Sequence, residues 1–217
     1  MSHIIFCKAP SRRDCLGGTG ISAILNKNKW TTREQLFDYY MALTDGPKEN
    51  NFMEWGKRLE DPVDIKYCDF NDEVTMDPVV EAEADLLPGH MCIHPEHHFL
   101  VGSPDRLVRK NARYKVKNHK LGLEVTGIKH GLEIKTAYFF SKRNWEKKGI
   151  PEQYLIQCQF YMLITGLDKW DMAVLHCGTA DYEQFTYEAD PILHTEMVVE
   201  AKKFWKEVQD ARKKKEE

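Results

Sequence analysis

The sequence lacks the features that mark membrane, secreted and thiolate-metal proteins. No apolar run approaches the roughly 20 residues of a membrane-spanning helix, and the first residues, MSHIIFCKAPSRR, show no signal-peptide pattern. The 6 cysteines are scattered and include no CxxC pair, which argues against a disulfide framework or an iron–sulfur site. We therefore expect a cytoplasmic protein with reduced thiols and no contact with a membrane.

The sequence also lacks a large excess of charge of either sign. The 31 Lys and Arg residues nearly balance the 34 Asp and Glu residues, and the formal net charge is −3. This balance excludes a protein that is basic over its whole surface. It does not exclude a local basic groove around an acidic site.

Apolar side chains are plentiful: they make up 42% of the 217 residues, enough for the core of one domain. Periodicity, caps and turns predict helices over 31–44, 50–68 with a break near Pro62, 151–166, and from Pro191 onward. The predicted strands lie within 90–105, 121–128, 131–139 and 170–178. We expect an α/β fold, with a central mixed sheet flanked by helices, in a single domain over 1–217. A frayed tail is expected at about 211–217.

The stretch GLEIKTAYFF (131–140) is an apolar strand that carries Glu133 and Lys135 on the same side. Burying these charges is costly unless something pairs with them. Upstream, GSPD places Asp105 at the end of another strand. Two carboxylates at neighbouring strand ends suit a hard divalent cation, which can polarise a phosphate and activate water. A nearby lysine can neutralise the charge that develops.

Each fragment alone also fits an ordinary structural role, with Asp105 capping a turn and Glu133 and Lys135 forming a partly exposed pair. A second register exists in GLEVTGIK (122–129), where Glu124 would be the acid. Glu124 is followed two residues later by Thr126 and not by a lysine. We therefore choose Glu133.

The predicted helix 151–166 carries a polar stripe of Tyr154, Gln157 and Tyr161 on an otherwise apolar surface. Packing alone could account for such side chains. Because the helix follows the acid–lysine strand, the stripe favours contact with a phosphate or a metal-bound water.

These motifs together resemble a known family. The segments GSPDRL, LEIK and QYLIQCQFYMLITG, in that order, resemble the phage lambda-type exonucleases, or viral recombinase nucleases, of the PD-(D/E)xK superfamily. FMEWGKRLED is similar to the tryptophan–glycine helix of that family, and GGTGISAIL (17–25) to its glycine-rich turn. The resemblance runs from about residue 12 to 178 and implies a restriction-endonuclease-like fold.

The resemblance also implies roles for individual residues. The metal ligands would be Asp105, Glu133, the carbonyl of Ile134 and Glu60. Lys135 would be the catalytic lysine, with Tyr154 and Gln157 supporting substrate and water.

The sequence departs from the family at the arginine that precedes the glycine turn, where this chain has Cys15. Arg12 or Arg13, slightly earlier, would have to hold a terminal 5′-phosphate instead. The turn itself offers backbone N–H groups and the hydroxyls of Thr19 and Ser22 at a helix start, where an anion is favoured.

A second departure is the basic stretch RLVRKNARYKVKNHK between the two acids, which we expect to be an inserted loop at about 106–120. Charge runs are usually solvated. Because this one follows a proposed metal ligand, we expect it to contact the DNA backbone without reading sequence. The contacts are assigned to Arg106, Arg109, Lys110 and Arg113.

The histidine-rich segment HMCIHPEHHF (90–99) raises zinc as an alternative. Structural zinc sites need four converging ligands, and no second cluster completes a site here. The segment is better read as a hairpin turn.

The resemblance predicts an exonuclease that uses Mg²⁺, or Mn²⁺ in its place. It would degrade one strand of linear duplex DNA from its end, in the 5′→3′ direction, and leave single-stranded DNA for recombination. The implied partners are duplex ends, a strand-annealing recombination protein and further copies in a ring, in a phage or prophage protein of a bacterial host. The alternatives are a restriction or repair endonuclease of the same superfamily and an inactive DNA-binding module.

Overall fold

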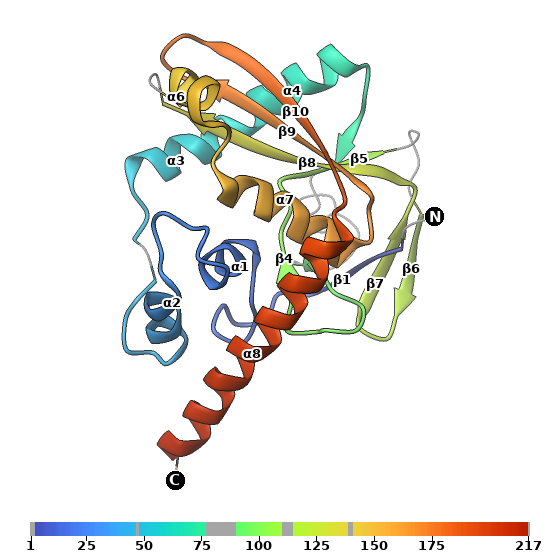
Figure 1. Cartoon of the computed structure of the whole chain (residues 1–217). Helices are drawn as coiled ribbons and strands as arrows, with labels where there is room; N and C mark the ends of the chain where they lie inside the picture. The colour runs from blue at the N-terminus through green and yellow to red at the C-terminus, as the bar shows by residue number, and fades with distance from the viewer. Residues whose placement is uncertain (1–2, 47, 77–89, 110–114, 139–140, 217) are drawn as a thin grey trace.

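The computed structural model describes residues 3–46, 48–76, 90–109, 115–138 and 141–216, and the strands of this part form two sheets (Figure 1). The first sheet contains, in spatial order, β4 (Val101–Gly102), β3 (His90–Ile93), β1 (Ile4–Lys8), β7 (Gly122–Thr126) and β6 (Lys115–His119). The second contains β10 (Asp181–Glu188), β9 (Lys169–His176), β8 (Ile128–Ala137), β5 (Arg106–Arg109) and β2 (Thr75–Met76). The pairing of β8 with β9 is parallel, and the other pairings are antiparallel.

The helices begin and end where the sequence supplies caps. Thr32 forms a capping box with Gln35, and Gly166 adopts a positive φ of 66° at the end of its helix. The break expected near Pro62 falls at Leu59, so that Pro62 lies in a first turn, where its missing N–H costs little. The helices are α1 (Gly18–Ile24), α2 (Arg33–Tyr40), α3 (Asn51–Arg58), α4 (Glu60–Asn71), α6 (Ser141–Lys148), α7 (Glu152–Thr165) and α8 (Pro191–Glu216).

The α/β class predicted from the sequence is confirmed, with three corrections. The strands form two sheets and not one central sheet. The basic stretch is not a single loop, because 106–109 lies in β5 and 115–119 in β6. The tail is not frayed at 211, because α8 continues to Glu216. Residues 110–114 lie outside the described part.

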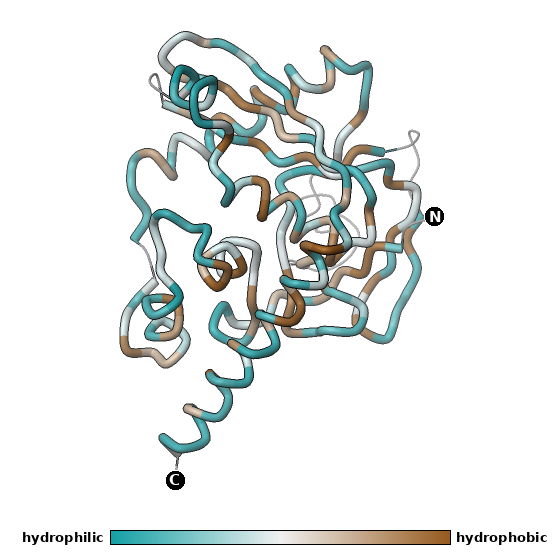
Figure 2. Tube along the Cα trace, viewed as in Figure 1, coloured by the Kyte–Doolittle hydropathy of each residue, from teal (hydrophilic) through white to brown (hydrophobic). Residues whose placement is uncertain are grey.

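The second sheet lies between two helical layers. On one face, Leu132 and Ile134 of β8 pack with Val63 and Tyr67 of α4. On the other face, α7 packs between the strands and the first half of α8. Hydrophobic segments of these elements lie together there (Figure 2). Because side chains alternate along β8, Glu133 points away from α4 and toward α7.

A buried polar network ties α4 to the second sheet. The Tyr67 hydroxyl donates to Oδ2 of Asp171 at 2.6 Å, and His130 Nε2 lies 3.0 Å from the same oxygen. Burial alone would raise the pKa of Asp171, but the hydrogen bonds from His130, Tyr67 and Thr186 outweigh it and lower this pKa. The network fixes α4, and with it Glu60 at the start of that helix, against β8 and β9.

Trp170 fills the space above a glycine of the neighbouring strand. Gly131 in β8 is paired with Trp170 in β9, and the fully buried indole ring also stacks on Tyr161 of α7 at 5.2 Å between ring centres. A Cβ atom at Gly131 would lie 2.2 Å from the indole. The ring therefore needs a glycine at this position.

We predict that Gly131→Ala destabilises the protein by about 1–3 kcal/mol, because the indole must shift within a packed core. The measurement is the free energy of unfolding by chemical denaturation. The matched control is Gly56→Ala in α3, where the nearest atom to an added Cβ is Thr136 Oγ1 at 3.5 Å. The control should be neutral or stabilising by up to about 1 kcal/mol, because alanine favours a helix. Equal stability of the two variants would contradict the packing described.

Candidate active site

A hydrogen bond joins the two acidic motifs. Asp105 lies between β4 and β5, and its Oδ2 accepts from the backbone N–H of Ile134 at 2.8 Å. β5 pairs with β8 as far as Leu132, opposite Arg106. Beyond that pair, the Asp105 carboxylate accepts the hydrogen bond of the Ile134 N–H in place of a backbone carbonyl of β5. The carboxylate is therefore held beside Glu133, as the sequence motifs predict.

Glu133 is a fully buried acid. Its Oε1 pairs with the Lys135 ammonium, while its Oε2 has no hydrogen-bond partner among the described residues. Burial, followed by the charge of Asp105, raises the pKa of Glu133 to about 8; the charge of Glu60 adds a smaller effect. Ionising this side chain is therefore electrostatically unfavourable, and one of its oxygens makes no hydrogen bond within the described residues.

Lys135 holds a protonated ammonium against this acid. Burial alone would lower its pKa, but the charges of Glu133 and Asp105 outweigh burial and raise it. The ammonium also lies 5.5 Å from the ring centre of Tyr154, on the first half of α7. Tyr154, which the stripe on α7 predicts to be near the site, is therefore close to the lysine.

The donor set fits a hard divalent cation only in part. Glu133 Oε2 is an unsatisfied buried oxygen beside a second carboxylate, which is the environment that such a cation takes. In the described ranges, however, no three His, Cys, Asp or Glu side chains are grouped closely enough to hold a metal ion. Two carboxylates and a carbonyl would therefore leave coordination positions for water and phosphate.

The rival acid Glu124 lies in the first sheet, on β7. It pairs with His3 and with Lys117 Nζ at 2.9 Å. The hydrogen bonds from Lys117 and His3 lower the pKa of Glu124. The structure therefore separates Glu124 from the site formed by Asp105 and Glu133.

The rest of the stripe on α7 supports the turn before Asp105. The Tyr161 hydroxyl donates to the carbonyl of Ser103 at 3.0 Å, and Gln157 Nε2 donates to that hydroxyl at 3.3 Å. Tyr161 is buried, so its role here is to position the backbone. Gln157 stands beside it, and an added Cβ at Gly18 would lie 3.4 Å from its Cγ.

A cavity of about 780 Å³ opens over the glycine turn and reaches Gly102 and Ser103, just before Asp105. Arg12, Cys15 and Thr19 are among its lining residues. Burial, with a contribution from Asp14, raises the pKa of the Cys15 thiol to about 11, so this position supplies no charge.

Ser22 lies away from this cavity, contrary to the predicted phosphate contact. It is buried, donates to the Thr19 carbonyl at 2.8 Å and accepts from Asn28 at 2.9 Å.

The structure distinguishes the two candidate arginines. Arg13 Nε donates to the Tyr39 carbonyl at 3.1 Å, and its Nη2 donates to the Thr44 carbonyl at 3.1 Å. This side chain is thus engaged in holding α2 and the following turn. Arg12 is exposed and lies in the cavity wall.

Arg106 is a buried structural residue and not a DNA contact. It is 5% exposed, and its guanidinium pairs with Asp61 at 2.5 Å and Asp64 at 3.0 Å on α4. Sequence reasoning missed these acids, although their spacing on one helical face marks them as partners for a cation. Arg109 is half-buried and donates to the Thr75 carbonyl at 3.0 Å. Lys110 and Arg113 lie outside the described residues.

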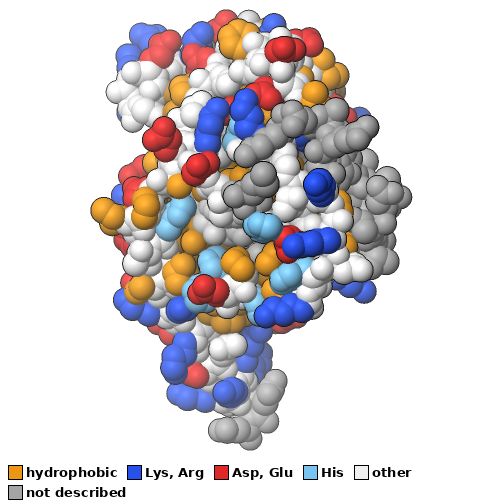
Figure 3. Space-filling model, turned by 90° about the vertical axis from the view of Figure 1, so that its right-hand side faces the viewer, with side chains coloured by type: hydrophobic (Ala, Val, Ile, Leu, Met, Phe, Trp, Pro, Cys, Tyr) orange, Lys and Arg blue, Asp and Glu red, His pale blue; other side chains and the backbone are white. Residues whose placement is uncertain are grey.

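The histidine-rich segment forms a turn between β3 and β4. His94 is buried, and its Nδ1 accepts from the backbone N–H groups of Glu96 and His97, both at 3.1 Å. The His94 and His97 rings stack at 4.7 Å. Histidine side chains gather on the face shown in Figure 3, among lysines and arginines. All 6 cysteines, including Cys92, are free thiols.

Comparisons with known proteins agree with the family suggested by the motifs. A family model described as the YqaJ-like viral recombinase domain matches residues 9–168. Uncharacterized protein YqaJ of Bacillus subtilis strain 168 is 28% identical over 156 residues, covering 71% of this chain. The match covers 40% of that relative, so the chain spans less than half of its length.

Two solved structures share the fold. The alkaline exonuclease LHK-Exo from Laribacter hongkongensis has a TM-score of 0.68 and 19% identity over 93% of this chain and 91% of its own. It was also solved in complex with dAMP. A phage-related exonuclease from Haemophilus somnus 129PT has a TM-score of 0.57 and 12% identity over 91% of this chain and 96% of its own. These likenesses confirm the restriction-endonuclease-like fold.

Within the described ranges, no helix is both long and apolar enough to cross a bilayer.

The turn at His94 predicts a dependence of stability on pH. Burial lowers the pKa of His94 to about 4 from 6.5, so the unfolded chain binds a proton more readily between these values. The free energy of unfolding should therefore fall as the pH drops from about 6.5 toward 4, by up to about 3 kcal/mol from this residue. Denaturant titrations at several pH values measure this.

The matched variants are His94→Asn and His98→Asn. Asparagine can still accept from the turn N–H groups without titrating, so His94→Asn should flatten the dependence. His98 is exposed, and its charge lowers the pKa of His94 by less than burial does, so its replacement should leave most of the slope in place. A slope unchanged in His94→Asn would rule out His94 as its source.

Proposed function

This chain belongs to the YqaJ-like viral recombinase domain family, and from that premise we propose that it is a metal-dependent deoxyribonuclease. The observation that carries the proposal is the hydrogen bond that brings Asp105 beside Glu133 and Lys135. An acidic pair with an unsatisfied buried oxygen next to a lysine is costly to fold. A bound cation would offset that cost.

The metal would be held by Asp105, Glu133 and the carbonyl of Ile134, with Glu60 reached through water. Oxygen ligands and open positions favour Mg²⁺, with Mn²⁺ as a substitute. Such a cation, when bound, polarises the scissile phosphate and lowers the pKa of a coordinated water. We propose that Lys135 orients the attacking water and neutralises charge on the phosphate as the bond breaks. The Tyr154 ring and Gln157 would place the substrate beside it.

We further propose that the enzyme is an exonuclease that acts at ends of duplex DNA in the 5′→3′ direction. The polarity comes from the family resemblance. A structural relative solved with dAMP is consistent with a nucleoside monophosphate as the product class. The single strand that remains would be passed to a strand-annealing recombination protein, and a ring of several copies would enclose the DNA, as in the phage enzymes that the sequence resembles.

The choice between exonuclease and endonuclease is tested with linear and covalently closed circular duplex DNA, in Mg²⁺ and in EDTA. We predict that the linear duplex is degraded in Mg²⁺ only, while the closed circle persists because it offers no end. Asp105→Asn and Glu133→Gln should lower the rate at least about 1,000-fold, because each removes a hard anionic ligand. Gel analysis over time measures both effects.

Glu124→Gln is the matched control, since it removes a buried acid from the first sheet. Its rate should stay within a few-fold of wild type. Cleavage of the closed circle would favour an endonuclease. Absence of any cleavage by the wild type would favour a DNA-binding module.

We propose that the cavity over the glycine turn holds a terminal 5′-phosphate and that Arg12 supplies the charge. Two observations support this proposal. Arg12 is exposed in the wall of the cavity, and the cavity extends to Ser103, which precedes Asp105 by two positions in the sequence. An arginine can grip two phosphate oxygens at once.

The predicted result is that wild type degrades 5′-phosphorylated ends about 10-fold faster than 5′-hydroxyl ends, and that Arg12→Ala removes this preference. Arg13→Ala should instead lower the melting temperature, because Arg13 holds the Tyr39 and Thr44 carbonyls, while the preference remains. Rates on matched linear duplexes labelled at either terminus test both statements. Release of label first from 3′ ends would refute the polarity, and a wild type indifferent to the phosphate would refute the pocket.

A further inference from the structure

A second cavity lies beyond Lys135, at the carboxyl end of β8. Its volume is about 460 Å³, within the roughly 300–1,000 Å³ that small-molecule sites occupy. Aromatic rings dominate its lining, and we call it the aromatic cleft. Its rings belong to Trp30, Phe52, Trp55, Tyr138, Trp145 and Tyr154.

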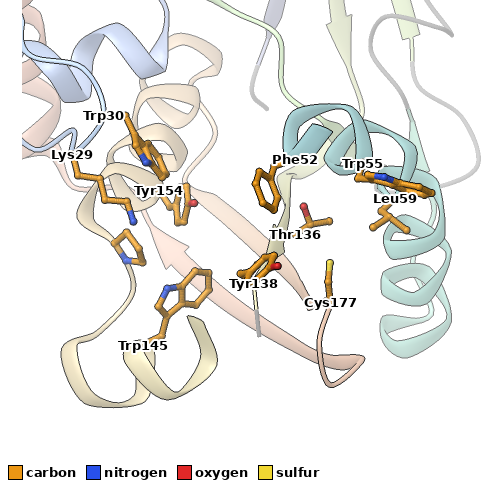
Figure 4. A pocket seen from close by; sticks show the side chains of 12 residues that line it. Lys29, Trp30, Phe52, Trp55, Leu59, Thr136, Tyr138, Trp145, Tyr154 and Cys177 are labelled. Carbon is orange, nitrogen blue, oxygen red and sulfur yellow. The ribbon is translucent and has the colours of Figure 1, made fainter. Parts of the chain in front are cut away.

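The rings form two facing walls (Figure 4). On one wall the Tyr154 ring centre lies 6.3 Å from that of Trp30 and 5.9 Å from that of Trp145. On the other wall Phe52 meets Tyr138 edge to face at 5.5 Å, and Trp55 lies beside them on α3. Thr136, the residue after Lys135, lies on the same wall as Phe52 and Tyr138.

These rings are unusually exposed for residues of their size. The exposed fractions are 62% for Trp30, 68% for Phe52, 61% for Trp55 and 61% for Tyr138. Single exposed apolar side chains are ordinary, but a group of them around one cavity marks a binding surface. In the part of the chain that the structure describes, no packing against other elements covers these four rings.

The charges around the aromatic cleft are those of a site for a polyanion. The Lys29 ammonium lies 4.5 Å from the Trp30 ring centre, at the cleft mouth. Trp145 lies on α6, whose sequence SKRNWEKK carries four cations and one acid; of these cations, Lys142 already pairs with Asp181 at 2.9 Å. Lys135, over the Tyr154 ring, connects the cleft with the candidate active site. A purely apolar protein segment would not be matched by these cations.

We propose that the aromatic cleft stacks unpaired nucleobases of the DNA strand that runs to or from the active site. The proposal rests on the proposed nuclease function and adds a site for the single-stranded part of the substrate. Every base has a π-face, so stacking on Trp30 and its neighbours holds a strand without reading its sequence. Lys29 and the cations of α6 would contact the phosphates between those bases.

The test compares two end-labelled duplexes that carry a four-nucleotide single-stranded extension. In one probe the four unpaired nucleotides carry bases, and in the other they are abasic, with sugars and phosphates kept. Extensions of both polarities are used, and affinity is measured by fluorescence anisotropy in EDTA. For one polarity we expect wild type to bind the base-bearing probe about 10-fold more tightly than the abasic probe.

Three variants locate the effect. Trp30→Ala should bring the ratio of the two affinities close to one, and Trp30→Phe should restore most of it. Phe70→Ala is the matched control, since Phe70 is a 68% exposed aromatic residue outside the cleft, on α4. It should leave the ratio unchanged. Thermal unfolding checks that all variants are folded.

The proposal is overturned if wild type binds both probes equally at both polarities, which is the result for a cleft that a protein segment fills. It is also overturned if Trp30→Ala weakens both probes by the same factor. Because EDTA prevents metal-dependent cleavage, the binding ratio is read independently of the nuclease assays. Failure of the nuclease proposal and failure of the stacking proposal are therefore distinguishable.

Discussion

The candidate site depends on one hydrogen bond, from the Ile134 N–H to the Asp105 carboxylate. A backbone N–H at the point where its neighbour strand ends would otherwise lose its ladder partner, which is costly in a buried strand. Here β5 pairs with β8 up to Arg106 and Leu132, and the acid that precedes β5 takes over. The same contact thus completes the sheet and places a negative charge beside Glu133. One oxygen therefore satisfies the strand and positions the charge on which the proposed function depends.

The second constraint is the burial of Glu133, whose cost must be compensated elsewhere. The Tyr67–His130–Asp171 network anchors α4 on one face of the sheet. On the other face, Trp170 fills the space over Gly131 on β8, and Tyr161 holds the Ser103 carbonyl, which positions the turn before Asp105. Packed and hydrogen-bonded layers on both faces keep the acids in place against mutual repulsion. The two acids are therefore an electrostatically unfavourable pair, held within surroundings that are well packed and hydrogen-bonded.

The sequence predicts those parts of the structure that local chemistry determines. Caps and periodicity place α2 and α7, and the acid–lysine strand with its upstream aspartate predicts that Asp105 and Glu133 lie close together, as they do. Nonlocal pairing is less accessible: nothing in RLVRKNARYKVKNHK shows that its ends join different sheets or that Arg106 is buried against Asp61 and Asp64. Likewise, Ser22 turns inward because Asn28 lies next to it, a contact that residue types alone do not reveal.

The excursion of the chain between Asp105 and Ile134 has a consequence for variation in length. After β5 the chain contributes β6 and β7 to the first sheet and then returns in β8. The entropy of closing such a loop grows only with the logarithm of its length, so doubling it costs about 0.6 kcal/mol. Lengthening the β6–β7 hairpin therefore leaves the two acids together. Shifting β8 by one residue would turn Glu133 toward α4 and leave its place to an apolar neighbour. Insertions in the β6–β7 hairpin, before Gly127, should thus leave the site nearly unchanged, whereas an insertion in β8, after Gly127, should destroy it.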